Sequence, residues 1–463
     1  MIKSLKLKNV GPLPDATISF GRRLNIITGD NGLGKSFLLD IIWFGLTNRW
    51  PIEVNGRMTS GNMARPMDRT KESSIKFFAG KGRSSETVQY NYERQQERWT
   101  VNNFNLGKSE IHKNLVLYAH YDGSFSVWDP YRNYWVRNLR EDMLERPPAF
   151  VFTPSEVWDG ANTIDRITGK EAPICNGLIR DWVSWQDRSR EGNLYDEFSI
   201  LKSCLVRLSP PDFPDNKKLI PGEHGRISTS DSREHPFIQM PYGNIPAVWA
   251  SAGIRRILTL AYMLTWTITE HMKSCDVLGE KPASQMTFLF DEVDAHLHPK
   301  WQRQIMGGIL NVLEMFSNVS RGGHPYQMSL FGPTAINTQI ISVTHSPLVM
   351  ASLESLFDKD YDKWLDLDLN MDDGNVQIEE RDFIKKGDAS NWLTSDAFDL
   401  KSTYSVEAEA AMARASELLK EGDDLDHEAI NLAYQDLLKA LDFKDPFLLR
   451  FRYLCQKKGV SLK

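Results

Sequence analysis

Residues Leu24–Ser36 read LNIITGDNGLGKS, and this stretch decides the fold. The first part, Leu24–Thr28, is a short apolar run rich in β-branched side chains, which is typical of a buried strand. Residues Gly29–Ser36 match the pattern G-x-x-x-x-G-K-[ST], and Phe37–Leu46 (FLLDIIWFGL) has the composition of a buried helix. A strand, a glycine-rich loop and a helix in this order predict a phosphate-binding site.

Each residue type in the loop suits a triphosphate. Glycine permits backbone angles that are closed to other residues, so successive N–H groups can face one anion. The positive end of the following helix dipole points at the same place. The Lys35 side chain supplies a positive charge for the β- and γ-phosphates, and the Ser36 hydroxyl suits Mg²⁺. We therefore predict that ATP and Mg²⁺ bind at the loop Gly29, Asp30, Asn31, Gly32, Leu33, Gly34, Lys35 and Ser36.

The bulk composition is that of a globular protein in a reducing compartment. Of 463 residues, 41% are hydrophobic and 25% are charged, an ordinary balance for a chain of roughly two or three domains. A formal net charge of −6 gives no overall basic field for nucleic acid, although a local basic patch stays open. The four cysteines form no C-x-x-C pair, and no apolar run reaches membrane-spanning length. We expect a cytoplasmic protein without a membrane partner.

A second anion cradle is predicted at Ser251-Ala252-Gly253, which precedes a strong helical pattern from about Ile254. A serine hydroxyl, small residues and free N–H groups at a helix start can bind a phosphate. Arg255 and Arg256 would lie on the same first turn, where they add charge or bind DNA. The simpler alternative is that Ser251 only caps the helix.

Two further segments place polar side chains at the ends of buried strands. Asp291 and Glu292 follow the apolar run Thr287–Phe290, and His345 follows Ile340–Thr344. The carboxyl ends of parallel strands are the edge of a sheet where ligands bind. Asp291 is suited to hold Mg²⁺, and Glu292 is suited to polarise an attacking water as a general base.

These four motifs, in this order, resemble those of ABC-type P-loop ATPases, in particular the heads of the RecF, SMC and OLD group. The run from Asp291 to Pro299, DEVDAHLHP, is similar to the D-E-x-x-x-H-L-H-P form of that group. The resemblance implies that His345 contacts the γ-phosphate. It also implies that Ser251 and Gly253 contact the ATP held by a second copy, so that a homodimer or a higher homo-oligomer is the active form.

The resemblance also implies the fold: α/β, with an ABC-ATPase-like, mostly parallel sheet with helices, a flanking antiparallel β-region, and a small helical C-terminal subdomain. We expect the ATPase head over residues 1–357, with an insertion at about 48–245, and a C-terminal hairpin and helical subdomain over 358–463. The flank would include an N-terminal hairpin at 1–20 and strands from residue 73 to about 136, and residues 209–235 would form a surface loop.

In ABC-type heads a glutamine after a strand near residues 149–152 contacts Mg²⁺ and the attacking water. The turn after that run holds no glutamine here. Ser155, Glu156 and Gln186 are the available substitutes, and the position stays unassigned.

Three other patterns have simpler interpretations. The aromatic residues between Tyr118 and Trp135 fit a base-stacking surface, but such residues more often pack a sheet. His296 and His298 look like a metal pair, but no third ligand is evident. OLD nucleases carry a TOPRIM domain with an acidic D-x-D motif, which Asp366 and Asp368 match; their alternation predicts instead the solvent face of a hairpin.

Compact heads of this kind, without long coiled-coil arms, resemble ATPase components of bacterial anti-phage systems such as Septu, PARIS and retron-associated systems. That resemblance implies a slow ATPase that controls a separately encoded effector nuclease. One alternative is a RecF-like repair ATPase that binds DNA. Another is a nucleotide-gated scaffold with little hydrolysis.

Overall fold

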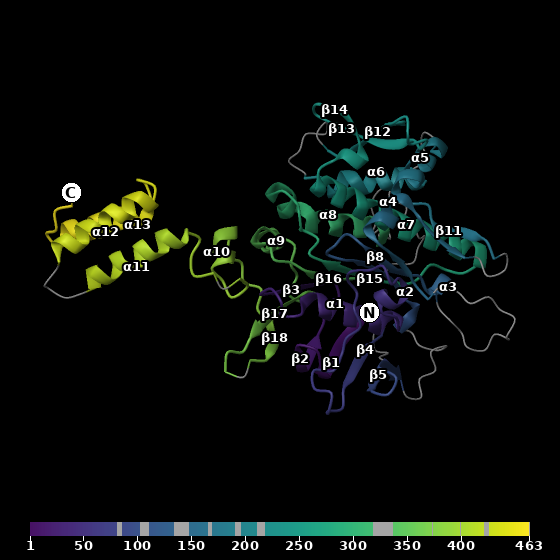
Figure 1. The fold of residues 1–463 in the computed structure, drawn as a ribbon, viewed down its shortest axis with the longest axis horizontal. Helices are drawn as coiled ribbons and strands as arrows, with labels where there is room; N and C mark the ends of the chain where they lie inside the picture. The colour runs from purple at the N-terminus through teal and green to yellow at the C-terminus, as the bar shows by residue number, and fades with distance from the viewer. Residues whose placement is uncertain are drawn as a thin grey trace. The chain divides into compact units, whose positions relative to one another are not determined.

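The computed structural model describes residues 1–80, 86–101, 111–133, 148–164, 169–189, 196–210, 218–317, 337–372, 374–398, 400–420 and 426–462. The chain forms two compact units, Met1–Ala389 and Ser390–Lys463. Each unit is described by itself below, and Figure 1 gives the labels of the helices and strands.

An eight-stranded sheet forms the centre of the first unit, in the order β18-β17-β3-β16-β15-β7-β8-β9. The strands from β17 to β7 are parallel to their neighbours, and β18, β8 and β9 are antiparallel at the two edges. Their bounds are β18 Val376–Arg381, β17 Lys363–Leu369, β3 Leu24–Gly29, β16 Asn337–Val343, β15 Gln285–Asp291, β7 Leu115–Ala119, β8 Phe125–Trp128 and β9 Phe150–Phe152. Every residue of β15 is buried, as expected for a parallel strand covered on both faces. The predicted α/β fold class is confirmed.

A separate antiparallel sheet has the order β2-β1-β4-β5-β6. Its strands are β2 Leu13–Ser19, β1 Ile2–Val10, β4 Ser74–Ala79, β5 Glu86–Glu93 and β6 Arg98–Val101. The predicted N-terminal hairpin is confirmed, because β1 and β2 pair with Val10 opposite Leu13 around a turn at Gly11, whose φ is +53°. Alternating burial along β2 and β4 shows that this sheet has one core face and one solvent face.

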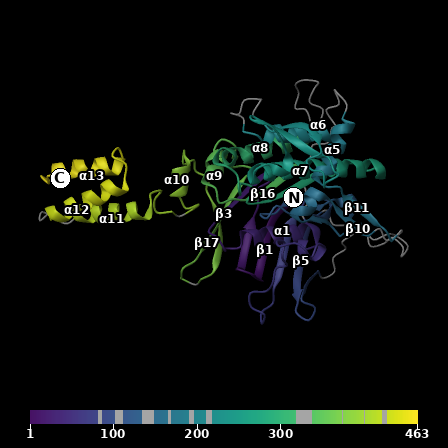
Figure 2. The same ribbon diagram turned by 45° about the horizontal axis from the view of Figure 1, so that its top comes forward.

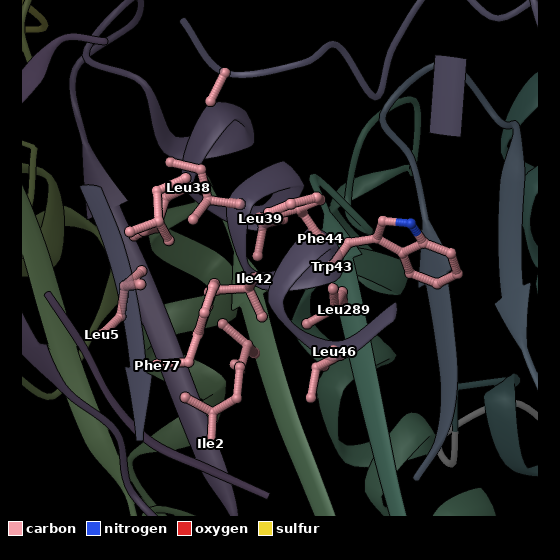
Figure 3. Close-up of a cluster of buried hydrophobic side chains, with 14 of the residues drawn as sticks. Ile2, Leu5, Leu38, Leu39, Ile42, Trp43, Phe44, Leu46, Phe77 and Leu289 are labelled. Carbon is pink, nitrogen blue, oxygen red and sulfur yellow. The ribbon is translucent and has the colours of Figure 1, made fainter. Parts of the chain in front are cut away.

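Helix α1 (Lys35–Thr47) lies between the two sheets and joins them into one core. Its side chains Leu38, Leu39 and Ile42 are completely buried in a cluster that also holds Leu5 from β1 and Leu289 from β15 (Figure 3). Each such side chain contributes roughly 1.5–3 kcal/mol to folding by leaving water. The helix that begins at the glycine loop is therefore anchored on both sides along its length.

The opposite face of the main sheet is covered by α6 (Glu197–Leu208), α7 (Ala252–Leu278) and α8 (Pro299–Ser317), as both ribbon views show (Figures 1 and 2). Trp266 of α7 packs edge-on against Phe150 and Phe152 of β9. These contacts hold α7 against the edge of the sheet.

Smaller elements complete this unit. They are α2 (Pro51–Val54), η2 (Ile111–Lys113), α3 (Pro130–Asn133), α4 (Pro154–Asp159), β10 (Ala161–Ile164), β11 (Glu171–Cys175), α5 (Leu178–Arg188), β12 (Ile220–Gly225), β13 (His235–Met240), β14 (Gly243–Pro246), η4 (Ala247–Trp249) and α9 (Pro347–Leu353). Helix α5 buries Trp182 and Trp185.

Two sequence-based expectations for this unit are wrong. Residues 115–119 and 125–128 were expected in the antiparallel flank, but β7 pairs in parallel with β15 inside the main sheet. The expected surface loop at 209–235 contains a strand, β12, which pairs with β13 in a three-stranded sheet. For β7 the outcome depends on pairing with a distant segment, which local composition does not reveal, whereas β12 pairs with the next strand along the chain.

The hairpin of β17 and β18 has the expected local form, but β17 also pairs in parallel with β3, with Asp366 opposite Thr28. This hairpin is thus an integral part of the main sheet, and the compact units divide after Ala389, whereas the predicted domain boundary follows residue 357.

The second unit contains α10 (Ala389–Leu393, which begins at the division), α11 (Val406–Lys420), α12 (His427–Ala440) and α13 (Pro446–Lys457). Its own core includes Ala415, Ile430, Leu437, Leu448 and Phe451. Helical periodicity at 405–421 and 427–441 predicted α11 and α12, and α13 was not predicted. Within the described residues of the whole chain, no helix is both long and apolar enough to cross a membrane.

Candidate functional site

The strands β3, β16 and β15 are consecutive neighbours and run in parallel, so their carboxyl ends meet at one edge of the sheet. The glycine loop follows β3, Thr344 and His345 follow β16, and Glu292 follows β15. The topology therefore brings together three of the four motifs found in the sequence.

The glycine loop has the backbone geometry that its composition predicts. Gly29, Gly32 and Gly34 have φ values of +129°, +81° and +93°, in a region that side chains strongly disfavour. A Cβ atom on Gly29 would stand 2.2 Å from the Leu367 carbonyl oxygen of β17. The first glycine of the loop is thus required by the neighbouring strand as well as by the turn.

Lys35 lies inside the loop, with a side chain that is almost completely buried. Its Nζ atom donates hydrogen bonds to the carbonyl oxygens of Gly29 at 2.8 Å and Asp30 at 2.6 Å. Burial lowers the pKa of Lys35, while the nearby carboxylates, first Glu292 and then Asp291, oppose that shift. The ammonium group is therefore held inside the loop by two backbone carbonyl groups.

Asp291 ends β15 and is 1% exposed. No well-formed hydrogen bond reaches either carboxylate oxygen among the described residues, although the Ser36 side chain is close enough to interact with the carboxylate. Burial raises the pKa of Asp291 to about 7, and the Ser36 side chain opposes that shift. A buried carboxylate with both oxygens unsatisfied is costly, unless a cation or a proton satisfies it. Carboxylate and hydroxyl oxygens are hard ligands, so Asp291 and Ser36 fit Mg²⁺.

Glu292 and His345 face each other across the ends of β15 and β16. Oε1 of Glu292 lies 3.5 Å from Nε2 of His345, and both side chains are about one-third exposed, at 37% and 30%. Burial, and next the positive charge of Lys35, lower the pKa of His345, which favours the neutral imidazole. Of the two adjacent carboxylates Asp291 and Glu292, Glu292 is the one that solvent reaches.

The backbone turns sharply at Glu292, whose φ of +49° is rare for a residue with a side chain. Its N–H donates to the Val343 carbonyl at 3.2 Å, and its own carbonyl accepts from Ala295. Just beyond, Thr344 donates to the buried Asp294 at 2.8 Å. Such a strained residue costs of the order of 1–3 kcal/mol and persists only where its surroundings hold it.

The predicted second cradle lies at the start of α7. Ser251 is exposed and caps the helix, because its Oγ accepts from the Ile254 N–H at 3.4 Å. Gly253 lies against the turn that follows Glu292: a Cβ atom there would stand 2.8 Å from the His296 carbonyl oxygen. The structure describes no contact from Ser251 to the glycine loop of the same chain, and its exposed position leaves it open to a second copy.

The two arginines of this first turn point in different directions. Arg255 is exposed, whereas Arg256 is partly buried and donates to the carbonyl oxygens of His120 at 2.9 Å and Asp291 at 3.3 Å. The two arginines were expected to add charge at the cradle or to bind DNA; Arg256 instead turns inward, because it packs against the ends of β7 and β15.

Asp366 was expected on the solvent face of its hairpin, and the structure corrects this. It is 3% exposed, accepts a hydrogen bond from Thr28 Oγ1 at 2.7 Å, and has Arg381 3.5 Å away. Asp368 is exposed, as the alternation predicted. Because β17 pairs with β3, Asp366 lies beside Thr28, the residue that precedes the glycine loop.

None of the three substitutes for the missing glutamine lies free at the site. Glu156 accepts hydrogen bonds from Asn55 and from the Thr153 N–H, Gln186 donates to the Gly222 carbonyl, and Ser155 lies in the first turn of α4, beyond the edge strand β9. The strand that lies beside β15 is β7, not β9. The turn that begins at His120, directly after β7, therefore occupies the position where the glutamine was expected. The run Leu115–Ala119 is apolar throughout, as is typical of a strand covered on both faces, but this pattern does not indicate which strand lies beside it.

A cavity of about 780 Å³ opens beside this turn and the start of α7. It is lined by Tyr121, Asp122, Gly123, Trp158, Arg233, Arg255 and Arg256, among others. Of the five aromatic residues of the run that the structure describes, Tyr118, Phe125 and Trp128 are buried in the sheet, Tyr131 is partly buried and Tyr121 is exposed. Tyr134 and Trp135 lie outside the described residues. His298 accepts a hydrogen bond from the Lys300 N–H at the start of α8.

The fold and the site define the class of this protein. Residues 4–140 match the family model described as "AAA domain", and residues 229–351 match the one described as "AAA domain, putative AbiEii toxin, Type IV TA system". The chain thus carries P-loop ATPase domains of the AAA type.

Its similarity to one named protein is more specific. Over 351 residues the chain is 23% identical to the Septu protein PtuA of Bacillus thuringiensis, across 75% of this chain and 72% of that one. The predicted resemblance to P-loop ATPases, including those of a defence system, is confirmed.

Two groups of solved structures are also similar. The Smc head domain of Pyrococcus furiosus, bound to the C-terminal domain of ScpA, gives a TM-score of 0.41 at 13% identity, over 82% of this chain and 96% of that one. The recombination mediator RecF gives 0.36 at 15% identity, over 82% of this chain and 98% of that one.

Proposed function

We propose that this chain binds ATP with Mg²⁺ and hydrolyses it slowly between two copies of itself. The observation that supports this proposal is the arrangement of three side chains at one edge of the main sheet. There a buried lysine lies within a glycine loop, next to a buried aspartate that lacks hydrogen bonds and a solvent-accessible glutamate. These groups have the charges and positions that a metal-bound triphosphate and an attacking water need.

Each residue would have one task in that reaction. Lys35 exchanges its bonds with the Gly29 and Asp30 carbonyls for phosphate oxygens, and the loop N–H groups and the α1 dipole add positive potential. Ser36 and Asp291 would hold Mg²⁺, which neutralises phosphate charge when bound. Glu292 takes the proton of a water that enters from solvent, and His345 orients that water or the γ-phosphate as a neutral donor.

The second copy would supply Ser251 and Gly253. The exposure of Ser251 at the start of a 27-residue helix supports this assignment, because the N-terminal end of a helix attracts a phosphate; Gly253 follows in the first turn and is partly buried. A complementation test is decisive. Lys35→Ala removes the loop charge, and Ser251→Arg blocks the cradle, so each variant alone should lack turnover.

Mixing the two variants creates a dimer with one intact composite site, in which loop and cradle come from different copies. Random pairing in a 1:1 mixture makes half of the dimers mixed, and each mixed dimer has one intact site of two, so we expect activity to return towards about a quarter of the wild-type value. Inactivity of the mixture, although both variants still form dimers, would refute the shared site. Retained ATP affinity in Lys35→Ala would refute the loop assignment itself.

We further propose that the ATPase restrains or activates a separately encoded effector nuclease in an anti-phage defence complex. The similarity to the Septu protein PtuA supports this proposal. The test is phage plating efficiency on cells that carry the native locus, with wild-type, Lys35→Ala and Glu292→Gln chains at matched expression. Equal plating for all three would refute a defence role that depends on the nucleotide.

A further inference from the structure

We infer that Arg256 is a positioning residue that joins the start of α7 to the Asp291–Glu292 end of β15, so that docking at the exposed cradle is transmitted to the metal and water sites. This inference rests on the proposed function, which supplies the metal and the second copy. In the sequence alone, Arg256 is indistinguishable from its neighbour Arg255.

The first step is the position of the guanidinium group. Nη2 of Arg256 donates to the carbonyl oxygens of His120, at 2.9 Å, and Asp291, at 3.3 Å. His120 follows β7 and Asp291 ends β15, and these strands are parallel neighbours. A single planar side chain therefore bridges the ends of two strands and fixes the backbone that carries the Asp291 carboxylate.

The second step is a contact on the other side of Glu292. Gly253, in the same first turn of α7, approaches the His296 carbonyl so closely that a Cβ atom would stand 2.8 Å from it. The helix start thus touches the chain one residue before Glu292, through Arg256, and four residues after it. Glu292 lies between these two contacts with a φ of +49°.

The third step is exposure. Ser251 faces solvent one turn from Arg256, whereas the Arg256 side chain is partly buried. When a second copy docks at the exposed end of this long, well-packed helix, the first turn of the helix moves as one rigid piece. The parts that such movement reaches first are the Asp291 carbonyl and the turn at Glu292. Partners that orient metal ligands in this way usually change metal affinity or activity about 10–100-fold when they are removed.

The test compares Arg256→Gln and Arg256→Lys with the matched control Arg255→Gln, in which the exposed neighbour on the same turn loses its charge. The first measurement is nucleotide affinity in EDTA, which reports on the glycine loop alone. The second is the Mg²⁺ or Mn²⁺ concentration that gives half of the metal-dependent thermal shift of the ATP-loaded full chain. The third is the division of the steady-state effect between kcat and KM.

For Arg256→Gln we expect EDTA affinity close to that of the wild type, and a rise of about tenfold in the half-saturating metal concentration. We also expect kcat to fall about tenfold with little change in KM. Arg256→Lys, which keeps one charged donor, should lie between Gln and wild type. Arg255→Gln should keep the wild-type metal dependence.

An unchanged metal dependence in Arg256→Gln would overturn the inference, as would an equal shift in Arg255→Gln. A merely structural role would reduce EDTA affinity and thermal stability together, with no recovery in the lysine variant. If Arg256→Gln fails to fold, wild-type metal dependence in Arg256→Lys counts against the inference. Failure of the wild-type protein to bind ATP at all would refute the proposed function instead.

Discussion

The Nε2 atom of His345, beyond the end of β16, lies 3.5 Å from the Oε1 atom of Glu292, beyond the end of β15. The two residues are 53 positions apart in the sequence and meet because their strands are parallel neighbours. Glu292 remains 37% exposed in this arrangement, whereas Asp291, its neighbour in the chain, is buried. Two adjacent carboxylates thus have different surroundings, one suited to a metal and the other to a water.

Glu292→Gln should abolish most turnover while ATP still binds. The amide keeps the shape of the side chain but cannot accept the proton of the attacking water, so we expect kcat to fall by about 100-fold or more. Phosphate release and nucleotide affinity, measured on the same preparation, check this prediction. The control is Glu93→Gln, an exposed position on β5. Wild-type turnover in Glu292→Gln would exclude Glu292 as the base.

Gly29→Ala should destabilise the first unit and weaken nucleotide binding. The new methyl group would meet the Leu367 carbonyl at 2.2 Å, at a residue whose φ is +129°. We expect a loss of about 2–4 kcal/mol in the free energy of unfolding, from strain and from separation of β3 and β17. Gly56→Ala is the matched control, because a Cβ atom there meets nothing within 4 Å. Equal denaturation midpoints for both variants would contradict the contact.

Asp366→Ala should cost more stability than Asp368→Ala. Removing the buried carboxylate leaves the Thr28 hydroxyl without its acceptor and takes away one of the two carboxylates beside Arg381, which costs about 1–3 kcal/mol. Asp368 is exposed, and its loss should change the free energy of unfolding by less than about 0.5 kcal/mol. Chemical denaturation of the two variants measures the difference. A larger loss of stability in Asp368→Ala than in Asp366→Ala would contradict the buried position of Asp366.

His224 should give a small stabilisation that is present in mild acid and lost in base. Burial alone would lower its pKa, but the hydrogen bonds that the imidazole donates to the carboxylates of Asp187 and Glu234 outweigh burial and raise the pKa above the usual 6.5. A group with a raised pKa in the folded state stabilises below its unfolded pKa, and that contribution disappears as the pH rises through the folded value.

The comparison is therefore wild type against His224→Gln, by thermal unfolding at pH 5.5 and at pH 8.5. At pH 5.5 the wild type should be more stable than His224→Gln. The difference should be less than about 1 kcal/mol, because the two ion pairs of His224 are open to solvent. The two proteins should converge at the higher pH. An advantage for the wild type that grows with pH would contradict the assignment.

The local part of the site was predictable, and its surroundings were not. The loop around Lys35, the Asp291–Glu292 pair and His345 were found because each lies next to a short run whose pattern identifies a buried strand. The inward turn of Arg256 was missed, because two arginines in succession have the same composition and differ only in what packs against them. Asp366 was placed on the wrong face for the same reason: alternation within a hairpin cannot reveal a third strand beside it.

The sequence by itself determined the strand, glycine loop and helix at residues 24–47, because each of these elements follows from contacts and backbone angles within a few residues. It also determined which polar side chains end the buried strands. Only the tertiary structure decided that β7 lies beside β15 and that β17 lies beside β3. Those neighbours are set by the summed burial of distant segments, a free energy that belongs to the whole sheet and leaves no mark in the pattern of any one strand.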